Sequence, residues 1–268
     1  VPECSNTAAV DLTNGTVANG TNIRIWNYNL TEGQRWKLES TTTSTAAPKI
    51  SGQTKPATMK AGSSFSIRGT VTSDLPLTEV TVGVYDTAGS MKAGKTVRPN
   101  TTSYDLRNVD TSIKFGSLTT GGYRYKVTAK TSAGTTTLVN SAFMVLGSGR
   151  TVADGTYYIE SMKNNGYGLN VSGNSSASGA NVVLGAKSSS NYMKYVFTYQ
   201  GNGYYKIKNA ASGRYLGVSG QKSASGSNVE QASGGTRWQV IPDGKGSYYL
   251  VPECSNTAAV DLTNGTVA

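Results

Sequence analysis

Alternating hydrophobic and polar residues predict β-strands in the middle of the chain. Apolar residues recur at every second position in four short runs, Phe65–Val71, Val80–Tyr85, Tyr123–Val127 and Phe143–Val145. A period of two turns one face of each strand toward a core and the other toward water. Glycine-containing turns such as Asp86–Gly89 separate the runs. The pattern predicts a β-sandwich of about seven strands between residues 48 and 147.

A longer repeat runs through the second half of the chain. The aromatic pair Tyr157-Tyr158 recurs as Tyr204-Tyr205 and Tyr248-Tyr249, at steps of 47 and 44 residues. The turn Gly179–Val182 returns 47 residues later as Gly226–Val229. Two landmarks with a common step predict related β units that follow one another along the chain.

The two ends of the chain have the same sequence. The first eighteen residues, Val1–Ala18, return unchanged as Val251–Ala268, a period of 250. With that period, the turn Gly20–Ile23 falls 44 residues after Gly226–Val229, so residues 1–40 continue the sequence from residue 250. We expect a window on a tandem array, in which neither end is a domain boundary. A free fragment would instead fold residues 1–40 back onto 151–250, or complete a neighbouring molecule.

Composition changes divide the chain into domains. A Ser/Thr-rich tract and a short Gly/Ser stretch interrupt the strand patterns. The predicted domains are 1–40, the final part of one β domain; 41–47, a linker; 48–147, the sandwich; 148–153, a second linker; and 154–268, a β domain that lacks its last part. In the last domain, residues 251–268 duplicate 1–18.

The amino-acid composition argues against the common kinds of catalytic and metal site. The chain has no histidine, so His-based triads and the commonest metal ligand are excluded. Its two cysteines, Cys4 and Cys254, occupy one position in successive copies, which leaves no disulfide within a copy. No paired carboxylates of the kind that glycoside hydrolysis needs stand out. We therefore expect no enzyme, no cofactor and no metal, and no run approaches the ~18 apolar residues of a membrane span.

The net charge is +10, and most of it lies in the sandwich. Residues 48–147 contain 12 Lys and Arg against 5 Asp and Glu, a net charge of +7. Such an excess attracts anionic partners such as wall polymers or acidic glycans. Nucleic acid is not expected, because the basic residues are scattered and are not clustered with stacking aromatics.

Two resemblances follow from these motifs. The segment Pro48–Leu146, with its motifs Lys60–Gly69 and Val80–Tyr85, resembles an immunoglobulin-like module of secreted Gram-positive bacterial proteins. The motifs Gly-x-Tyr-Tyr, Gly-x-x-Leu-x-Val and Gly-x-Asn-Val, each found in full in two units and altered in the third, resemble the ricin-B-type β-trefoil lectin, over residues 151–268 plus 1–40. The signature Gln-x-Trp is intact at Gln34–Trp36, partial at Thr236–Trp238 and lost at Met193–Tyr195. The expected fold is all-β, with a β-trefoil split across the chain ends plus an immunoglobulin-like sandwich.

The lectin resemblance implies one sugar site. In that family an Asp accepts hydroxyl hydrogen bonds and an aromatic ring stacks on the sugar. The matching residues are Asp11, its duplicate Asp261, Trp26 with its neighbour Asn27, and Gln34 of the signature. The other two units have Asn170 with Gly185, and Gly217 with Ala232, so the resemblance implies structural roles for them. Gly33 stands where the family often has Asn. An alternative is that Asp11 only bonds a turn and Trp26 only packs between repeats.

The expected function is structural. We interpret the chain as a repeat segment of an extracellular bacterial filament or surface array, secreted or displayed on the cell, with weak carbohydrate binding by the trefoil. Its partners would be further copies of itself, joined head to tail covalently or by strand complementation, together with glycans or anionic wall polymers. The alternative is a glycan-binding targeting region of a larger secreted enzyme that acts on cell walls or glycans.

Overall fold

The computed structural model describes residues 1–38 and 46–265. The chain forms two compact units, Val1–Ser44 and Thr45–Ala268. Strands dominate the described residues, in which the α-helical structure is one turn, α1 (Arg107–Asp110). The predicted all-β fold is thus confirmed. No helix within these ranges has the length and hydropathy that a membrane span requires.

The N-terminal unit is built on one antiparallel strand pair. Strand β1 (Ala8–Leu12) pairs with β2 (Ile23–Asn27), so that Asp11 lies opposite Arg24 and Ala9 opposite Trp26. The 3-10 helix η1 (Thr13–Gly15) turns the chain after β1, where Asn14 and Gly15 have φ of 58° and 67°. Asn and Gly accept this left-handed backbone more readily than other residues do. A second 3-10 helix, η2 (Glu32–Gln34), contacts β1 and η1.

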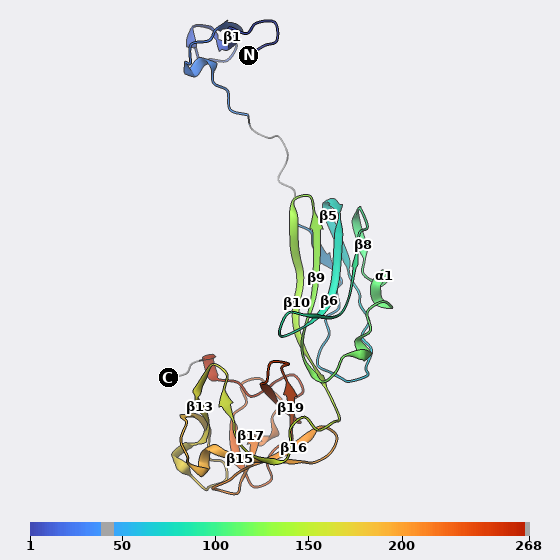
Figure 1. Ribbon diagram of the computed structural model, residues 1–268, viewed down its shortest axis with the longest axis vertical. Coiled ribbons are helices and arrows are strands. Elements are labelled where there is room, and N and C mark those ends of the chain that lie inside the picture. The colour runs from blue at the N-terminus through green and yellow to red at the C-terminus, as the bar shows by residue number, and fades with distance from the viewer. Residues whose placement is uncertain (39–45, 266–268) are drawn as a thin grey trace. The chain divides into compact units, whose positions relative to one another are not determined.

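Residues 49–146 form two sheets that share one core (Figure 1). A five-stranded sheet has the order β4-β10-β9-β6-β7, and a three-stranded sheet has the order β3-β5-β8. The strands are β3 (Lys49–Ser51), β4 (Met59–Lys60), β5 (Thr70–Leu77), β6 (Glu79–Asp86), β7 (Met91–Val97), β8 (Thr101–Asp105), β9 (Gly121–Thr131) and β10 (Gly134–Leu146). This is a sandwich-like arrangement of the kind that the alternating sequence predicted.

One predicted strand begins later than its sequence pattern suggested. The run Phe65–Val71 enters a strand only at Thr70. Before that point the backbone bonds to side chains: the Ile67 amide donates to Asp110 Oδ1 at 2.7 Å, and the Arg68 amide donates to Thr54 Oγ1 at 2.9 Å. Ile67 is still fully buried. The alternation therefore predicted burial correctly, but not the sheet pairing.

Residues 155–252 form a second β domain. Its strands are β11 (Gly155–Tyr158), β12 (Glu160–Ser161), β13 (Asn164–Val171), β14 (Val182–Ala186), β15 (Lys194–Tyr199), β16 (Tyr204–Asn209), β17 (Tyr215–Val218), β18 (Val229–Ala232), β19 (Trp238–Pro242) and β20 (Tyr248–Pro252). We call residues 155–199 repeat 1 and residues 204–242 repeat 2. Repeat 3 begins at Tyr248, and the N-terminal unit contains a second copy of its first part together with the sequence that follows it.

The three repeats share their backbone geometry. The amide that follows β13, β17 or β1 donates to the carbonyl of an Asn that precedes β14, β18 or β2, at 2.9 Å in Ser172–Asn181, 2.9 Å in Ser219–Asn228 and 3.2 Å in Thr13–Asn22. With the period of 250 added to Thr13, these bonds keep the steps of 47 and 44 residues. The repeat spacing of 47 and 44 residues therefore identifies positions with equivalent backbone hydrogen bonds.

The terminal tryptophan of repeat 2 and that of the N-terminal unit each bond to the backbone of an earlier strand, β17 and β1 respectively. Trp238 Nε1 donates to the Leu216 carbonyl at 3.0 Å, and Trp36 Nε1 donates to the Val10 carbonyl at 3.1 Å. Tyr195 occupies the equivalent place in repeat 1, where burial raises the pKa of its hydroxyl. Trp238 is fully buried, whereas Trp36 in the N-terminal unit is half exposed.

The duplicated eighteen residues lie in two different environments. Val251 is 2% exposed and Val1 is 81% exposed, although they are the same residue of the same sequence. Residues 8–12 form strand β1, whereas residues 258–262 form no strand. The difference arises because β2 pairs with the first copy and the second copy has no such partner among the described residues.

The buried tryptophan of repeat 2 predicts a large stability effect. We expect Trp238→Ala to lower the free energy of unfolding of this domain by about 3–5 kcal/mol, because it leaves a cavity in the core and removes one hydrogen bond to the Leu216 carbonyl. Urea denaturation followed by circular dichroism measures this. Tyr248→Ala is the control in the same domain, since Tyr248 is 47% exposed, and its cost should stay near ~1 kcal/mol. Equal losses in the two variants would contradict the role of Trp238.

Candidate functional site

Two predicted site residues, Asp11 and Trp26, share one face of the β1–β2 pair with their neighbour Arg24. In an antiparallel ladder, residues opposite each other point to the same side of the sheet, as do residues two apart on one strand. Asp11 lies opposite Arg24, and Trp26 is two residues from Arg24. The sequence of these strands therefore brings a carboxylate, a guanidinium and an indole ring together on one surface.

Arg24 connects the other two groups. Its Nε lies 3.4 Å from Asp11 Oδ2, and its guanidinium carbon lies 4.1 Å from the centroid of the Trp26 ring. The Asp11 side chain is 8% exposed, and Trp26 as a whole is 50% exposed. A cation over an indole face and a partly buried ion pair hold both groups in fixed positions. Arg24 thus orders the carboxylate and the ring without filling all of the accessible ring surface.

The second carboxylate oxygen of Asp11 remains open. Asp11 Oδ1 accepts no hydrogen bond from the described residues, and Gly33 lies beside it. A Cβ on residue 33 would lie 3.4 Å from this oxygen, in van der Waals contact, so glycine leaves more room beside it than a larger residue would. An ionised carboxylate oxygen is a strong acceptor for a hydroxyl group. The site can therefore accept a hydrogen bond from a small polyol.

Gln34 acts on the backbone around the site. Its Nε2 donates to the Asn27 carbonyl at 3.0 Å, and its Oε1 accepts from the Asn29 amide at 3.0 Å. Gln34 is nearly buried, and both ends of its amide are engaged by these two bonds. It fixes the turn after β2, whereas the exposed Asn27 lies on the sheet face of Ile25, away from Asp11 and Trp26, so the structure does not bring this predicted residue into the site. Gln34 is thus a positioning residue here.

The equivalent positions in the other repeats lack the same chemistry. Asn170 lies opposite Val183 in repeat 1, and Gly217 lies opposite Glu230 in repeat 2. The ring position of Trp26 is Gly185 or Ala232, opposite Gly168 and Tyr215 respectively. In the described part of the chain, the carboxylate and ring therefore combine on one sheet face in the N-terminal unit.

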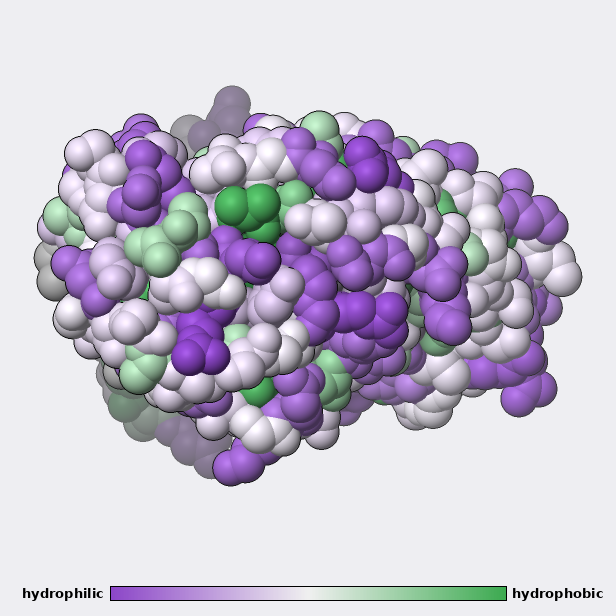
Figure 2. All heavy atoms as spheres, turned by 90° about the horizontal axis from the view of Figure 1, so that it is seen from below, coloured by the Kyte–Doolittle hydropathy of each residue, from purple (hydrophilic) through white to green (hydrophobic). Residues whose placement is uncertain are grey.

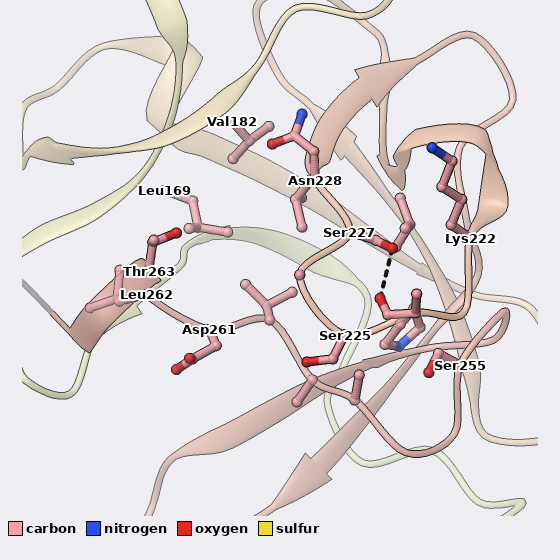
Figure 3. Close-up of a pocket in the computed structure, with 18 of the residues that line it drawn as sticks. Leu169, Val182, Lys222, Ser225, Ser227, Asn228, Ser255, Asp261, Leu262 and Thr263 are labelled. Atoms are coloured by element: carbon pink, nitrogen blue, oxygen red, sulfur yellow. Dashed lines mark hydrogen bonds between the residues drawn. The ribbon is translucent and has the colours of Figure 1, made fainter.

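The duplicate carboxylate Asp261 stands apart from any ring of that kind. It is exposed, whereas Asp11 is 6% exposed, and its segment has no paired strand. Residues 258–263 instead line a groove on repeats 1 and 2 (Figure 3). Within residues 1–38 and 46–265, no cluster of three or more Cys, Asp or Glu side chains is placed to hold a metal ion.

Arg24 is the site residue that motif matching missed. The resemblance draws attention to the Asp and the aromatic, and it assigns no role to the residue between them. The signal was present in the alternation of Ile23, Arg24, Ile25 and Trp26, because a period of two puts Arg24 and Trp26 on one face. Its position opposite Asp11 depends on the register of the hairpin, which the turn geometry fixes.

Residues 191–268 match a family model described as a ricin-type beta-trefoil lectin domain-like family. This segment covers β15 to β20 and the duplicated eighteen residues, so Asp261 lies within the match. The predicted lectin resemblance is confirmed for this segment, as is the predicted fold class of an all-β chain with a β-trefoil. A comparison with curated proteins gave no match.

Solved structures with similarity to the chain include a designed 3-fold symmetric protein, ThreeFoil, with 31% identity over 43% of this chain and 84% of that one, at a TM-score of 0.41. The PSL1a-E64 complex has 19% identity over 41% of this chain and 48% of that one, at a TM-score of 0.32. The exo-beta-1,3-galactanase 1,3Gal43A from Clostridium thermocellum has 15% identity over 79% of this chain and 50% of that one, at a TM-score of 0.35. The chain spans about half the length of the last two.

Proposed function

We propose that this chain is a carbohydrate-binding segment whose sugar site is formed by Asp11 and Trp26. The observation that carries the proposal is the shared face on which the open Asp11 Oδ1 and the half-exposed Trp26 ring lie together. A sugar has hydroxyl groups at its rim and an apolar C–H face, so it needs an acceptor beside a flat ring. The family match of residues 191–268 supports the same class of ligand.

Arg24 gives this site its geometry. Its contact with Asp11 Oδ2 leaves Oδ1 for a ligand hydroxyl, and its contact with Trp26 steadies the ring that receives the sugar. A guanidinium carries five donors, so Arg24 also has N–H groups to offer to ligand oxygens. One carboxylate, one ring and a shallow setting imply weak affinity for a single sugar.

Weak sites gain strength when they are repeated. We propose that the chain belongs to an extracellular array that carries one such site per period of 250 residues, in a bacterial filament or surface protein with a structural role. The identical sequences Val1–Ala18 and Val251–Ala268 support the array. Several sites on one molecule raise the overall affinity through effective concentration. Neither a catalytic role nor a cofactor is part of the proposal.

The surface is compatible with an extended, exposed array. Figure 2 shows a face dominated by hydrophilic and weakly polar residues, with hydrophobic residues in small separate patches. The sandwich adds a net charge of +7, which favours anionic polymers nearby. Polar surfaces of this kind limit non-specific association.

Sugar binding depends on two side chains in this proposal. We expect Trp26→Ala and Asp11→Asn each to weaken binding at least ~10-fold, because they remove the stacking face and the charged acceptor. Saturation-transfer NMR with galactose, glucose, mannose and N-acetylglucosamine measures this. Tyr28→Ala is the control, because Tyr28 is a 61% exposed aromatic that lies outside β2. Binding that survives both substitutions would count against the proposal, and so would the absence of binding to all four sugars.

The array predicts the size of the native protein. Under denaturing and reducing conditions, native material should have a mass many times the 28.0 kDa of this sequence. Partial sequencing of its internal peptides should then return residues 240–268 followed by the sequence that begins at Asn19. A native mass near 28.0 kDa would contradict a covalent array.

A further inference from the structure

Repeats 1 and 2 of the second β domain concentrate positive charge. Residues 155–242 contain 8 Lys and Arg against 2 Asp and Glu, a net charge of +6. Glu160 forms an ion pair with Lys187, whereas Glu230 forms no ion pair within the described part of the chain. Most cations of this segment therefore have no carboxylate partner in it. Their positions on the strands decide whether the excess charge is scattered or gathered.

Three lysines lie on one outer face of the adjacent strands β15 and β16 (Figure 1). In their antiparallel ladder Val196 lies opposite Lys208, and residues two apart on one strand point to the same side. Lys194 is two residues from Val196, and Lys206 is two residues from Lys208, so all three lysines share that side. The intervening residues of both strands are buried in the core of the domain. The pleat of the sheet thus gathers three positive charges on its outer surface.

Two tyrosines flank these lysines. Tyr215 of β17 lies opposite Lys208, and the centroid of its ring is 5.1 Å from Lys208 Nζ and 5.3 Å from Lys206 Nζ. The attraction of an ammonium group for the negative face of a ring holds these two lysines near each other in spite of their equal charge. Tyr158 of β11 lies opposite Lys194, and neither tyrosine hydroxyl has a hydrogen-bond partner among the described residues. We call Lys194, Lys206, Lys208, Tyr158 and Tyr215 the lysine–tyrosine face.

The three ammonium groups remain unneutralised. Lys206 Nζ donates to both carbonyls of Gly234–Gly235, the second at 2.9 Å, and Lys194 Nζ donates to Asn191 Oδ1 at 3.0 Å. Lys208 Nζ makes no hydrogen bond or ion pair with a described residue. The acceptors carry no net charge, so they position the ammonium groups without cancelling them. Like charges gathered in this way repel one another until an anion binds between them.

The lysine–tyrosine face is accessible in the folded chain. All five of its members are exposed or half-buried. The adjoining strand β18 adds one carboxylate, Glu230, against the three lysines, so the local charge stays positive. The strands of the face, β11 and β15 to β17, pair with one another within residues 155–218, so neither end of the sequence contributes to it.

We propose that the lysine–tyrosine face binds an acidic polysaccharide, at a site separate from Asp11 and Trp26 of the N-terminal unit. Carboxylates of the polymer accept hydrogen bonds from the three ammonium groups, which are strong donors to an anion. Hydroxyls of the polymer pair with the two tyrosine hydroxyls. They also pair with the hydroxyls of Thr156 and Thr198, which are exposed on the same side of the sheet.

The hydroxyl groups between the charges favour a polysaccharide over a polyphosphate. A phosphate polymer offers negative charge but no hydroxyl donors, so it leaves the neutral groups of the face without partners. Planar recognition of phosphate is also the strength of arginine, whereas the cations of this face are all lysines. A uronic acid carries one carboxylate and several hydroxyls on each ring. It therefore matches the mixture of ammonium and hydroxyl groups on the face.

The test is calorimetric titration of the full chain with polygalacturonate, at low ionic strength and again with added salt. We expect binding that weakens as the salt concentration rises, because salt screens the lysine charges. Lys194→Gln combined with Lys208→Gln should weaken binding at least ~10-fold. Lys222→Gln combined with Lys245→Gln is the matched control, because it removes two exposed lysines of the same domain that lie outside the face. Its affinity should stay within ~2-fold of the wild type.

A second pair of substitutions tests the class of polymer. Tyr158→Phe combined with Tyr215→Phe removes two hydroxyl groups and leaves the charges in place. We expect it to weaken the binding of polygalacturonate at least ~3-fold and to leave the binding of polyphosphate unchanged. Equal losses for both polymers would count against recognition of sugar hydroxyls.

Three results would overturn the proposal. They are the absence of polygalacturonate binding, binding that the two lysine substitutions leave intact, and tighter binding of polyphosphate than of polygalacturonate. Trp26→Ala removes the proposed sugar site, and it should leave polygalacturonate binding unchanged. Loss of polygalacturonate binding in that variant would assign the polymer to the Asp11–Trp26 site instead, so the two proposals fail separately.

Discussion

The pairing of the strand Ile23–Asn27 with Ala8–Leu12 is the contact on which the rest of the account depends. It places Asp11, Arg24 and Trp26 on one face and Val10, Ile23 and Ile25 on the other. The first face carries the proposed sugar site, and the second carries the apolar residues of the repeat. The same short ladder therefore links ligand binding to packing between repeats.

The duplicated sequence provides an internal comparison for this contact. Residues 8–12 with their partner form a strand, and residues 258–262 without it do not, although the amino acids are identical. Local propensity is the same in both copies, so the difference comes from pairing alone. β-strand formation depends on cross-strand neighbours more than on intrinsic preference. Repeats of this kind stabilise one another only when each is next to a complete neighbour.

Much of the fold could be predicted from the sequence because its patterns are local and periodic. The alternation of Val80–Tyr85 predicted β6, and the steps of 47 and 44 residues predicted bonds such as Ser219 to Asn228. The late start of β5 could not be predicted, because Ile67 bonds to the distant side chain of Asp110. Arg24 was missed for a similar reason, since its role appears only once the register places it opposite Asp11.

The candidate site also differs from its sequence description in one role. Gln34 was grouped with the sugar-binding residues through its signature motif. Its amide instead holds the backbone of Asn27 and Asn29, a task that no linear motif distinguishes from ligand contact. A sequence match marks a position that matters, and the hydrogen-bond geometry decides whether it touches the ligand or supports the residues that do.

The central claim is that the strand Ile23–Asn27 pairs with Ala8–Leu12 in the register that places Arg24 opposite Asp11, and disulfide trapping tests it most directly. In a background with Cys4 and Cys254 replaced by serine, one variant carries Arg24→Cys with Asp11→Cys, and a control carries Arg24→Cys with Val10→Cys. Residues directly opposite each other in a ladder lie close enough to form a disulfide, whereas a residue one position out of register points to the other face. The account predicts that oxidation gives a cross-linked monomer for the first variant and no intramolecular cross-link for the control. A first variant that stays unlinked under oxidation would contradict it.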